Sequence, residues 1–103
     1  MKIQAQEGVK ALNGKDIVTS DNIVLTVGNA IANMLIAPKE GGSYQFDKVK
    51  SYVLAQKFYS EKVVEVDDSD LQKIKKTIES DTSYGPIVSG FILLVFDKLL
   101  NKK

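Results

Sequence analysis

Residues 85–100 read GPIVSGFILLVFDKLL, and the predicted fold is built outward from this most apolar part of the chain. Pro86 directly follows Gly85, and proline is favoured at the first position of a helix because its φ angle already suits one. Two sides of this helix are apolar, one formed by Ile87, Phe91, Leu94 and Val95 and the other by Val88, Ile92, Phe96 and Leu99. A helix that is apolar on both sides must be covered on both. We therefore predict that the helix of residues 86–100 is the centre of the domain, that one of its faces meets a second chain, or both.

Two more helices are predicted upstream from apolar residues that recur three or four positions apart. The first begins after Thr26, whose hydroxyl can cap it, and ends before Pro38. Its apolar face consists of Val27, Ala30, Ile31, Met34 and Leu35. The second runs from about Tyr44 to Tyr59, and its predicted buried stripe is Phe46, Val49, Tyr52, Val53 and Tyr59. Its lysines are expected to face outward.

A third helix is predicted to start at Asp67, after a short extended segment of residues 62–66. Acidic residues crowd its first turn, and lysines follow, so the charges complement the helix dipole. Its narrow apolar face consists of Leu71, Ile74 and Ile78.

The first 25 residues predict short extended pieces. Asn13-Gly14 lies between residues 9–12 and 15–18, which is the signal for a hairpin with a two-residue turn. The alternative is a helix over residues 3–12 that ends at Asn13-Gly14. We prefer the hairpin.

The sequence thus predicts a mainly α protein, a four-helix domain with a small N-terminal β-hairpin element. A chain of 103 residues has room for one domain. We expect residues 1–25 to form the β element and residues 26–101 the helical bundle, with no internal repeat or linker.

The composition excludes several kinds of chemistry. The chain contains no Cys, His, Arg or Trp. Zinc sites of the usual Cys and His type, Cys nucleophiles and Ser-His-Asp triads are therefore impossible. The acidic cluster Asp67-Asp68-Ser69-Asp70 departs from a calcium loop, because the sixth position counted from Asp68 is Lys73 rather than glycine. Helix capping explains the cluster better, so we assign no catalytic, cofactor or metal residue and expect no enzyme activity.

The charges are almost balanced, with 14 lysines against 13 carboxylates. Nucleic-acid-binding domains normally carry a basic excess, so nucleic acid is not an expected partner. The N-terminus has no apolar leader, and residues 87–96 are too few to span a membrane. We expect a soluble protein.

Three tyrosines at predicted helix ends, Tyr44, Tyr59 and Tyr84, are candidate contacts for a protein partner, since aromatic residues dominate interface energetics. Phe91 and Phe96 are candidates for self-association or for the core. Lys73, Lys75 and Lys76 are candidates for binding an anion, such as the phosphate of a nucleotide.

Several segments resemble small proteins encoded by tailed bacteriophages and prophages. The likeness covers roughly residues 23–96. It is carried by Leu25-Thr26-Val27-Gly28 with Ala30, Met34 and Leu35, by residues 52–59, by Val64-Glu65-Val66-Asp67 with Asp70, Ile74-Lys75 and Ile78-Glu79, and by Pro86-Ile87-Val88 followed by Gly90. The resemblance implies expression in the cytoplasm of a host bacterium and supplies no catalytic residues.

We therefore expect a non-enzymatic phage accessory protein that binds a host or phage protein, inhibits or redirects it, and forms a homo-oligomer. One alternative is a virion or tail-assembly component. Another is an oligomer that sequesters a nucleotide-type signalling ligand in anti-phage defence.

Overall fold

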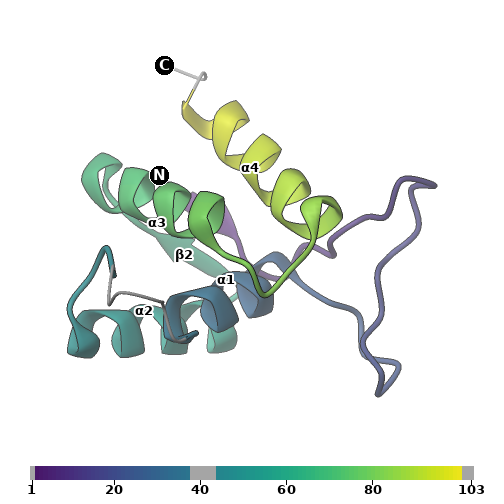
Figure 1. The fold of residues 1–103 in the computed structure, drawn as a ribbon, viewed down its shortest axis with the longest axis horizontal. Helices are drawn as coiled ribbons and strands as arrows, with labels where there is room; N and C mark the ends of the chain where they lie inside the picture. The colour runs from purple at the N-terminus through teal and green to yellow at the C-terminus, as the bar shows by residue number, and fades with distance from the viewer. Residues whose placement is uncertain (1, 38–43, 101–103) are drawn as a thin grey trace.

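The computed structural model describes residues 2–37 and 44–100, which form four α-helices and one two-stranded antiparallel sheet (Figure 1). In chain order the elements are β1 (Lys2–Gln4), α1 (Val27–Ile36), α2 (Lys48–Ser60), β2 (Val63–Glu65), α3 (Asp68–Ser80) and α4 (Pro86–Leu100). This arrangement confirms the predicted mainly α fold with a minor β component. Pro38 and residue 101, which served as predicted boundaries, lie outside the described residues.

The sheet joins the N-terminus to the middle of the chain. Ile3 of β1 lies opposite Val64 of β2, and both side chains are buried. The amide of Ala5 extends the pairing by donating to the carbonyl of Lys62 over 2.9 Å. The predicted extended segment of residues 62–66 is confirmed over β2. Its pairing with β1 was not predicted, because two strands of three residues carry no local signal of their partner.

The N-terminal hairpin is also confirmed, but its turn contains three residues rather than two. The amide of Ala11 donates to the carbonyl of Lys15 over 2.9 Å, and that of Gly14 donates to the carbonyl of Ala11 over 2.9 Å. Gly14 has a φ of +80°, whereas Asn13 does not have a positive φ. A two-residue type I′ turn needs positive φ at both central residues, so the three-residue form with its left-handed glycine results.

A second turn of the same kind follows eight residues later. The amide of Thr19 donates to the carbonyl of Ile23, and Asn22 takes the left-handed position with a φ of +61°. Three residues at this eight-residue spacing are joined in a ring of backbone hydrogen bonds. The amide of Val9 donates to the carbonyl of Leu25, that of Leu25 to Ile17, and that of Ile17 to Val9. The backbone pairing of this segment therefore recurs every eight residues.

The centre of the domain is α1, not α4 as one sequence prediction proposed. Figure 1 shows α1 between α2 on one side and α3 on the other, and it packs against both. Its predicted face is confirmed as buried: Val27, Ala30, Ile31, Met34 and Leu35. The hydroxyl of Thr26 caps the helix by accepting from the amide of Asn29 over 3.1 Å.

Gly28 allows the backbone of α1 to approach the backbones of α2 and of the segment after β1 closely. A methyl group at this position would lie 2.2 Å from the backbone oxygen of Phe58 and 2.8 Å from that of Ala5. The amide of Gly28 donates to that same Ala5 oxygen over 2.7 Å. Glycine is therefore required here by the close approach of three backbone segments.

The predicted buried stripe of α2 is wrong except at Phe46, which precedes the helix. The buried face consists of Ser51, Leu54, Ala55 and Phe58, whereas Val49, Tyr52, Val53 and Tyr59 are exposed. Asp47 caps the helix by accepting from the amide of Lys50 over 2.8 Å, so α2 begins at Lys48 rather than near Tyr44. Small residues at Ser51 and Ala55 allow α1 to approach α2, and this packing decides which face is buried.

The two C-terminal helices follow their local signals. Asp67 caps α3 by accepting from the amide of Asp70 over 2.7 Å, and Leu71, Ile74 and Ile78 are buried as predicted. α4 begins at Pro86, and its inward face consists of Val88, Ile92 and Phe96. Its opposite face leaves Ile87 and Leu94 exposed to solvent, so α4 covers the core with one side only. None of the helices in residues 2–37 and 44–100 is both long and apolar enough to cross a membrane.

Candidate functional site

Two neighbouring hollows lie along the exposed side of α1, and we call them together the tyrosine groove. The two hollows share Asn33 and Tyr59 in their linings. The first, of about 360 Å³, is lined by Ala32, Asn33, Ile36, Tyr52, Ala55, Gln56, Tyr59 and Ser60. The second, of about 330 Å³, is lined by Ile17, Val18, Thr19, Leu25, Asn29, Asn33, Tyr59, Tyr84 and Val88.

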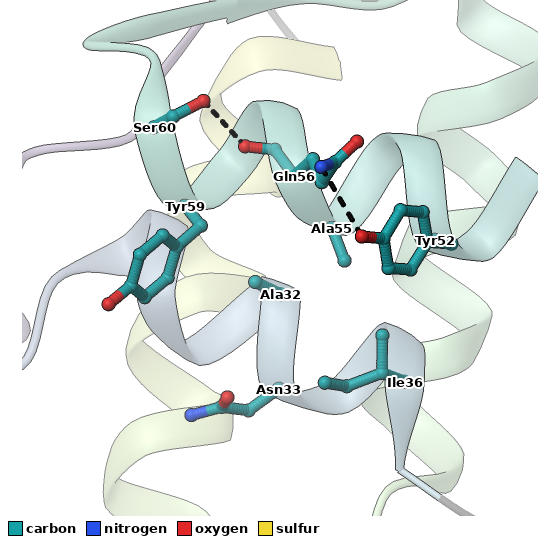
Figure 2. A pocket seen from close by; sticks show the side chains of 8 residues that line it. All are labelled: Ala32, Asn33, Ile36, Tyr52, Ala55, Gln56, Tyr59 and Ser60. Atoms are coloured by element: carbon teal, nitrogen blue, oxygen red, sulfur yellow. Dashed lines mark hydrogen bonds between the residues drawn. The ribbon is translucent and has the colours of Figure 1, made fainter.

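The first hollow lies where two small residues face each other. Figure 2 shows Ala32 of α1 opposite Ala55 of α2, with the rings of Tyr52 and Tyr59 on either side of Ala55. The two rings are seven residues apart, which places them two turns apart on the same side of α2. Because alanine side chains cannot fill the space between the rings, an open hollow forms at this point of the helix pair.

Hydrogen bonds hold the α2 wall of the groove. Nε2 of Gln56 donates to the hydroxyl of Tyr52 over 3.4 Å, and Oγ of Ser60 donates to the backbone oxygen of Gln56 over 2.7 Å (Figure 2). These contacts join consecutive turns of α2. Both hydrogen bonds therefore lie within α2 and do not connect it to α1.

The second hollow is closed on its far side by Tyr84, in the segment that leads into α4. Nδ2 of Asn33 donates to the Tyr84 hydroxyl over 2.8 Å. The carboxylate of Asp81 accepts from the amides of Ser83 and Tyr84 over 2.9 and 3.1 Å, which shapes the turn that presents the ring. Tyr84 is therefore fixed at both its backbone and its hydroxyl.

The lining of the tyrosine groove is uncharged. Among residues 2–37 and 44–100, its lining contains hydroxyl groups, carboxamides and apolar side chains but no Asp, Glu or Lys, although 26% of the chain is charged. A charged group that enters the groove would lose water without gaining a partner of opposite charge, which is unfavourable. The groove therefore suits an uncharged ligand with apolar and hydrogen-bonding parts.

The structure brings two of the predicted interface residues together. Tyr59 and Tyr84 line the same hollow, and Tyr59 is 72% exposed. Tyr44 is 43% exposed but precedes α2, whereas Tyr59 lies in its last turn. It does not line the tyrosine groove.

The two phenylalanines of α4 have different positions. Phe91 lines a third hollow, of about 520 Å³, between α4 and the hairpin residues Lys10, Ala11 and Leu12. Phe96 is fully buried among the core residues, so its side chain is not available to a partner. Of the two alternatives predicted for Phe96, self-association or core, this burial agrees with the core.

The three candidate lysines of α3 do not share one direction. Nζ of Lys75 lies 3.2 Å from the carboxylate of Asp97 on α4. Nζ of Lys73 lies 5.7 Å from the centre of the Phe46 ring, on the side of the molecule that faces α2. Lys76 is exposed. The geometry therefore does not gather the ammonium groups of Lys73 and Lys75 around a single anion.

The acidic cluster is explained by local structure. Asp67 caps α3, and Asp70 lies 3.2 Å from Nζ of Lys50. Over the described ranges, no group of three or more Asp or Glu side chains is placed to hold a metal ion.

Sequence reasoning missed most of the groove. Tyr52 was predicted to be buried but is 61% exposed, and neither Asn29 nor Asn33 was singled out. A signal was present in α1, since these two asparagines stand four residues apart in an otherwise apolar helix. That spacing places both on one face, which is the face that α2 and α3 leave open.

Comparison of the chain with protein-family models, with curated proteins and with solved structures finds no match. The candidate function therefore rests on the geometry and chemistry of the groove.

Proposed function

We propose that this chain is a non-enzymatic accessory protein that binds another protein through the tyrosine groove and thereby inhibits or redirects it. The observation that carries the proposal is the convergence of Tyr59 and Tyr84 on Asn33 in one uncharged groove. The resemblance to bacteriophage proteins supports the setting: a phage-encoded chain acting in the cytoplasm of the host bacterium.

The side chains of the groove favour a protein partner. Tyrosine combines a large apolar ring with a hydrogen-bonding hydroxyl and is enriched at the energetic centres of protein interfaces. Three tyrosines line the groove, and exposed apolar side chains of Ile36 and Val18 extend its surface at the two ends. Nucleic acid is a poor fit, because its binding depends on lysine and arginine contacts to phosphates.

The chemistry of the groove also supports a role in binding rather than catalysis. The lining residues that the structure describes include no carboxylate, ammonium or imidazole group that could act as a general acid or base near neutral pH. Its Tyr and Asn side chains are suited to shape recognition and hydrogen bonding.

The test compares two exposed tyrosines. Proteins retained from a bacterial lysate by the immobilised full chain are purified and titrated individually against wild type, Tyr59→Ala and Tyr44→Ala. Tyr59 is 72% exposed, so its truncation changes the groove without opening a core cavity. We expect Tyr59→Ala to weaken binding at least about tenfold, which is ~1.4 kcal/mol, and Tyr44→Ala to leave the Kd nearly unchanged.

Inhibition or redirection is then measured as the partner's own activity with saturating wild-type chain and with Tyr59→Ala. The proposal fails if no purified protein binds the wild type, or if binding does not depend on Tyr59.

A further inference from the structure

We infer that the tyrosine groove holds an extended, uncharged segment of the partner, whose backbone pairs with Asn29 and Asn33. This inference rests on the proposed function and specifies the chemistry of the bound segment. It follows from the spacing of the two carboxamides, from the hydrogen-bonding capacity of Asn33 and from the uncharged side chains of the described lining residues.

The spacing of the asparagines matches an extended chain. Asn29 and Asn33 are four residues apart on α1 and both line the second hollow. A helix rises 1.5 Å per residue, so their side chains leave α1 about 6 Å apart along its axis. An extended chain repeats its backbone orientation every two residues, about 6.6 Å. Asn29 can thus form a hydrogen bond with the backbone of one residue of the bound segment, and Asn33 with the backbone of the residue two positions further on.

The carboxamide of Asn33 is fixed by one hydrogen bond and can form further hydrogen bonds with a ligand. Its Nδ2 donates to the Tyr84 hydroxyl over 2.8 Å. A carboxamide has two donor hydrogens and an acceptor oxygen, so one hydrogen bond leaves a donor and the Oδ1 acceptor for a ligand. That pair of groups complements the N–H and C=O of a peptide. Fixing the carboxamide before binding also reduces the entropy lost on association.

The length and shape of the groove set the size of the segment. The lining residues on α1 run from Asn29 to Ile36, which is about 10 Å along the helix axis. This length fits about three residues of extended chain at roughly 3.3 Å each. The first hollow, of about 360 Å³ between Ala32 and Ala55, can accept one large apolar side chain of the segment. The expected motif is therefore short, uncharged and contains one large apolar residue.

The experiment uses a displayed library of random linear dodecapeptides, selected on the immobilised full chain. We expect an enriched motif of uncharged residues. A synthetic peptide with that motif should bind Asn29→Ala at least tenfold more weakly than wild type. Gln72→Ala, which removes an exposed carboxamide on α3 outside the groove, is the matched control and should bind normally. Circular dichroism of each variant checks that the helices are intact.

A backbone scan gives a readout that a purely side-chain interaction would not produce. Peptides with a single N-methyl group lose one amide hydrogen each. We expect at least tenfold weaker binding when the methyl group is on alternate residues of the motif, and little change at the residues between them.

Several results would overturn the inference. They are the absence of any enriched motif, a motif rich in charged residues, and a peptide whose binding ignores both Asn29→Ala and N-methylation. If a purified folded partner still binds in a Tyr59-dependent manner, only the extended-segment inference fails, and the proposed function stands. A small molecule of nucleotide mass that copurifies with wild type but not with Tyr59→Ala would overturn both.

Discussion

Asn33 on α1 and Tyr84 before α4 are 51 residues apart in sequence and are joined by a hydrogen bond of 2.8 Å from Nδ2 to the hydroxyl. This contact connects the central helix to the segment that leads into the last helix. Both residues line the second hollow together with Tyr59. This side of the tyrosine groove is therefore built around a contact that no local pattern predicts.

Replacing Tyr84 with Phe removes the hydroxyl but keeps the ring. We expect a loss of about 0.5–1 kcal/mol in the free energy of unfolding, because the hydrogen bond is solvent-exposed and therefore modest. Urea denaturation measures the change, and Asn33→Ala together with the double variant completes a double-mutant cycle. A coupling energy near zero would show that the two side chains do not interact in solution.

Gly28 and Gly90 are both helical, but a methyl group would have opposite effects at the two sites. At Gly28 it would lie 2.2 Å from the backbone oxygen of Phe58, so we expect Gly28→Ala to destabilise by about 3 kcal/mol or more. At Gly90 an added methyl group would have no described atom within 4 Å apart from its chain neighbours and the backbone of its own helix, so Gly90→Ala should stabilise by about 0.5–1 kcal/mol through helix propensity. Thermal unfolding of both variants checks the contrast, and equal shifts would contradict the deep position of α1.

The N-terminal turn requires a left-handed residue at Gly14. Its φ of +80° is unfavourable for alanine, so Gly14→Ala should cost about 1 kcal/mol although the surrounding space is open. Gly85→Ala is the control, since Gly85 also has open space around it but no positive φ. Chemical denaturation gives both values. If Gly14→Ala proves as stable as wild type, the turn is not populated in the form described.

The outer face of α4 provides a test of the predicted homo-oligomer. Leu94 is 61% exposed and Ile87 is 45% exposed. If this face meets a second copy, Leu94→Lys should convert an oligomer to a monomer without changing stability, as measured by native mass spectrometry and sedimentation. Phe96→Ala is the contrasting change, because truncating a fully buried ring should cost about 3–5 kcal/mol.

A wild-type chain that is monomeric at all concentrations would contradict the homo-oligomer. A large ring that does not bind other proteins would favour the virion-assembly alternative.

Local signals predicted most of the secondary structure. Thr26, Asp67 and Pro86 mark the starts of α1, α3 and α4, because each acts on backbone groups within about one helical turn. The buried faces of α1 and α3 were also predictable, since their apolar residues occupy one side of the helix. The hairpin at Asn13-Gly14 followed from its turn residues, although the length of the turn did not.

The face of α2 was not predictable, because its apolar and aromatic residues are spread around the helix. Burial was decided by fit to α1: Ala55 and Ser51 are small enough for the close approach that Gly28 permits, and Tyr52 and Tyr59 are left outside. The same packing turned the two asparagines of α1 to the surface and created the groove. The candidate site therefore exists because α1 is the central helix and α2 packs against it through its small residues.

The sequence by itself determined where α1, α3 and α4 begin, which faces of α1 and α3 are apolar, and that the chemistry of Cys and His is unavailable. These properties depend on residue identity and on hydrogen bonds within a few positions. Only the tertiary structure decided that α1 rather than α4 is central, that β1 pairs with β2, and that Tyr59 and Tyr84 meet at Asn33. Those relationships depend on shape and volume between segments far apart in the chain, where the packing of one helix sets what its neighbours expose.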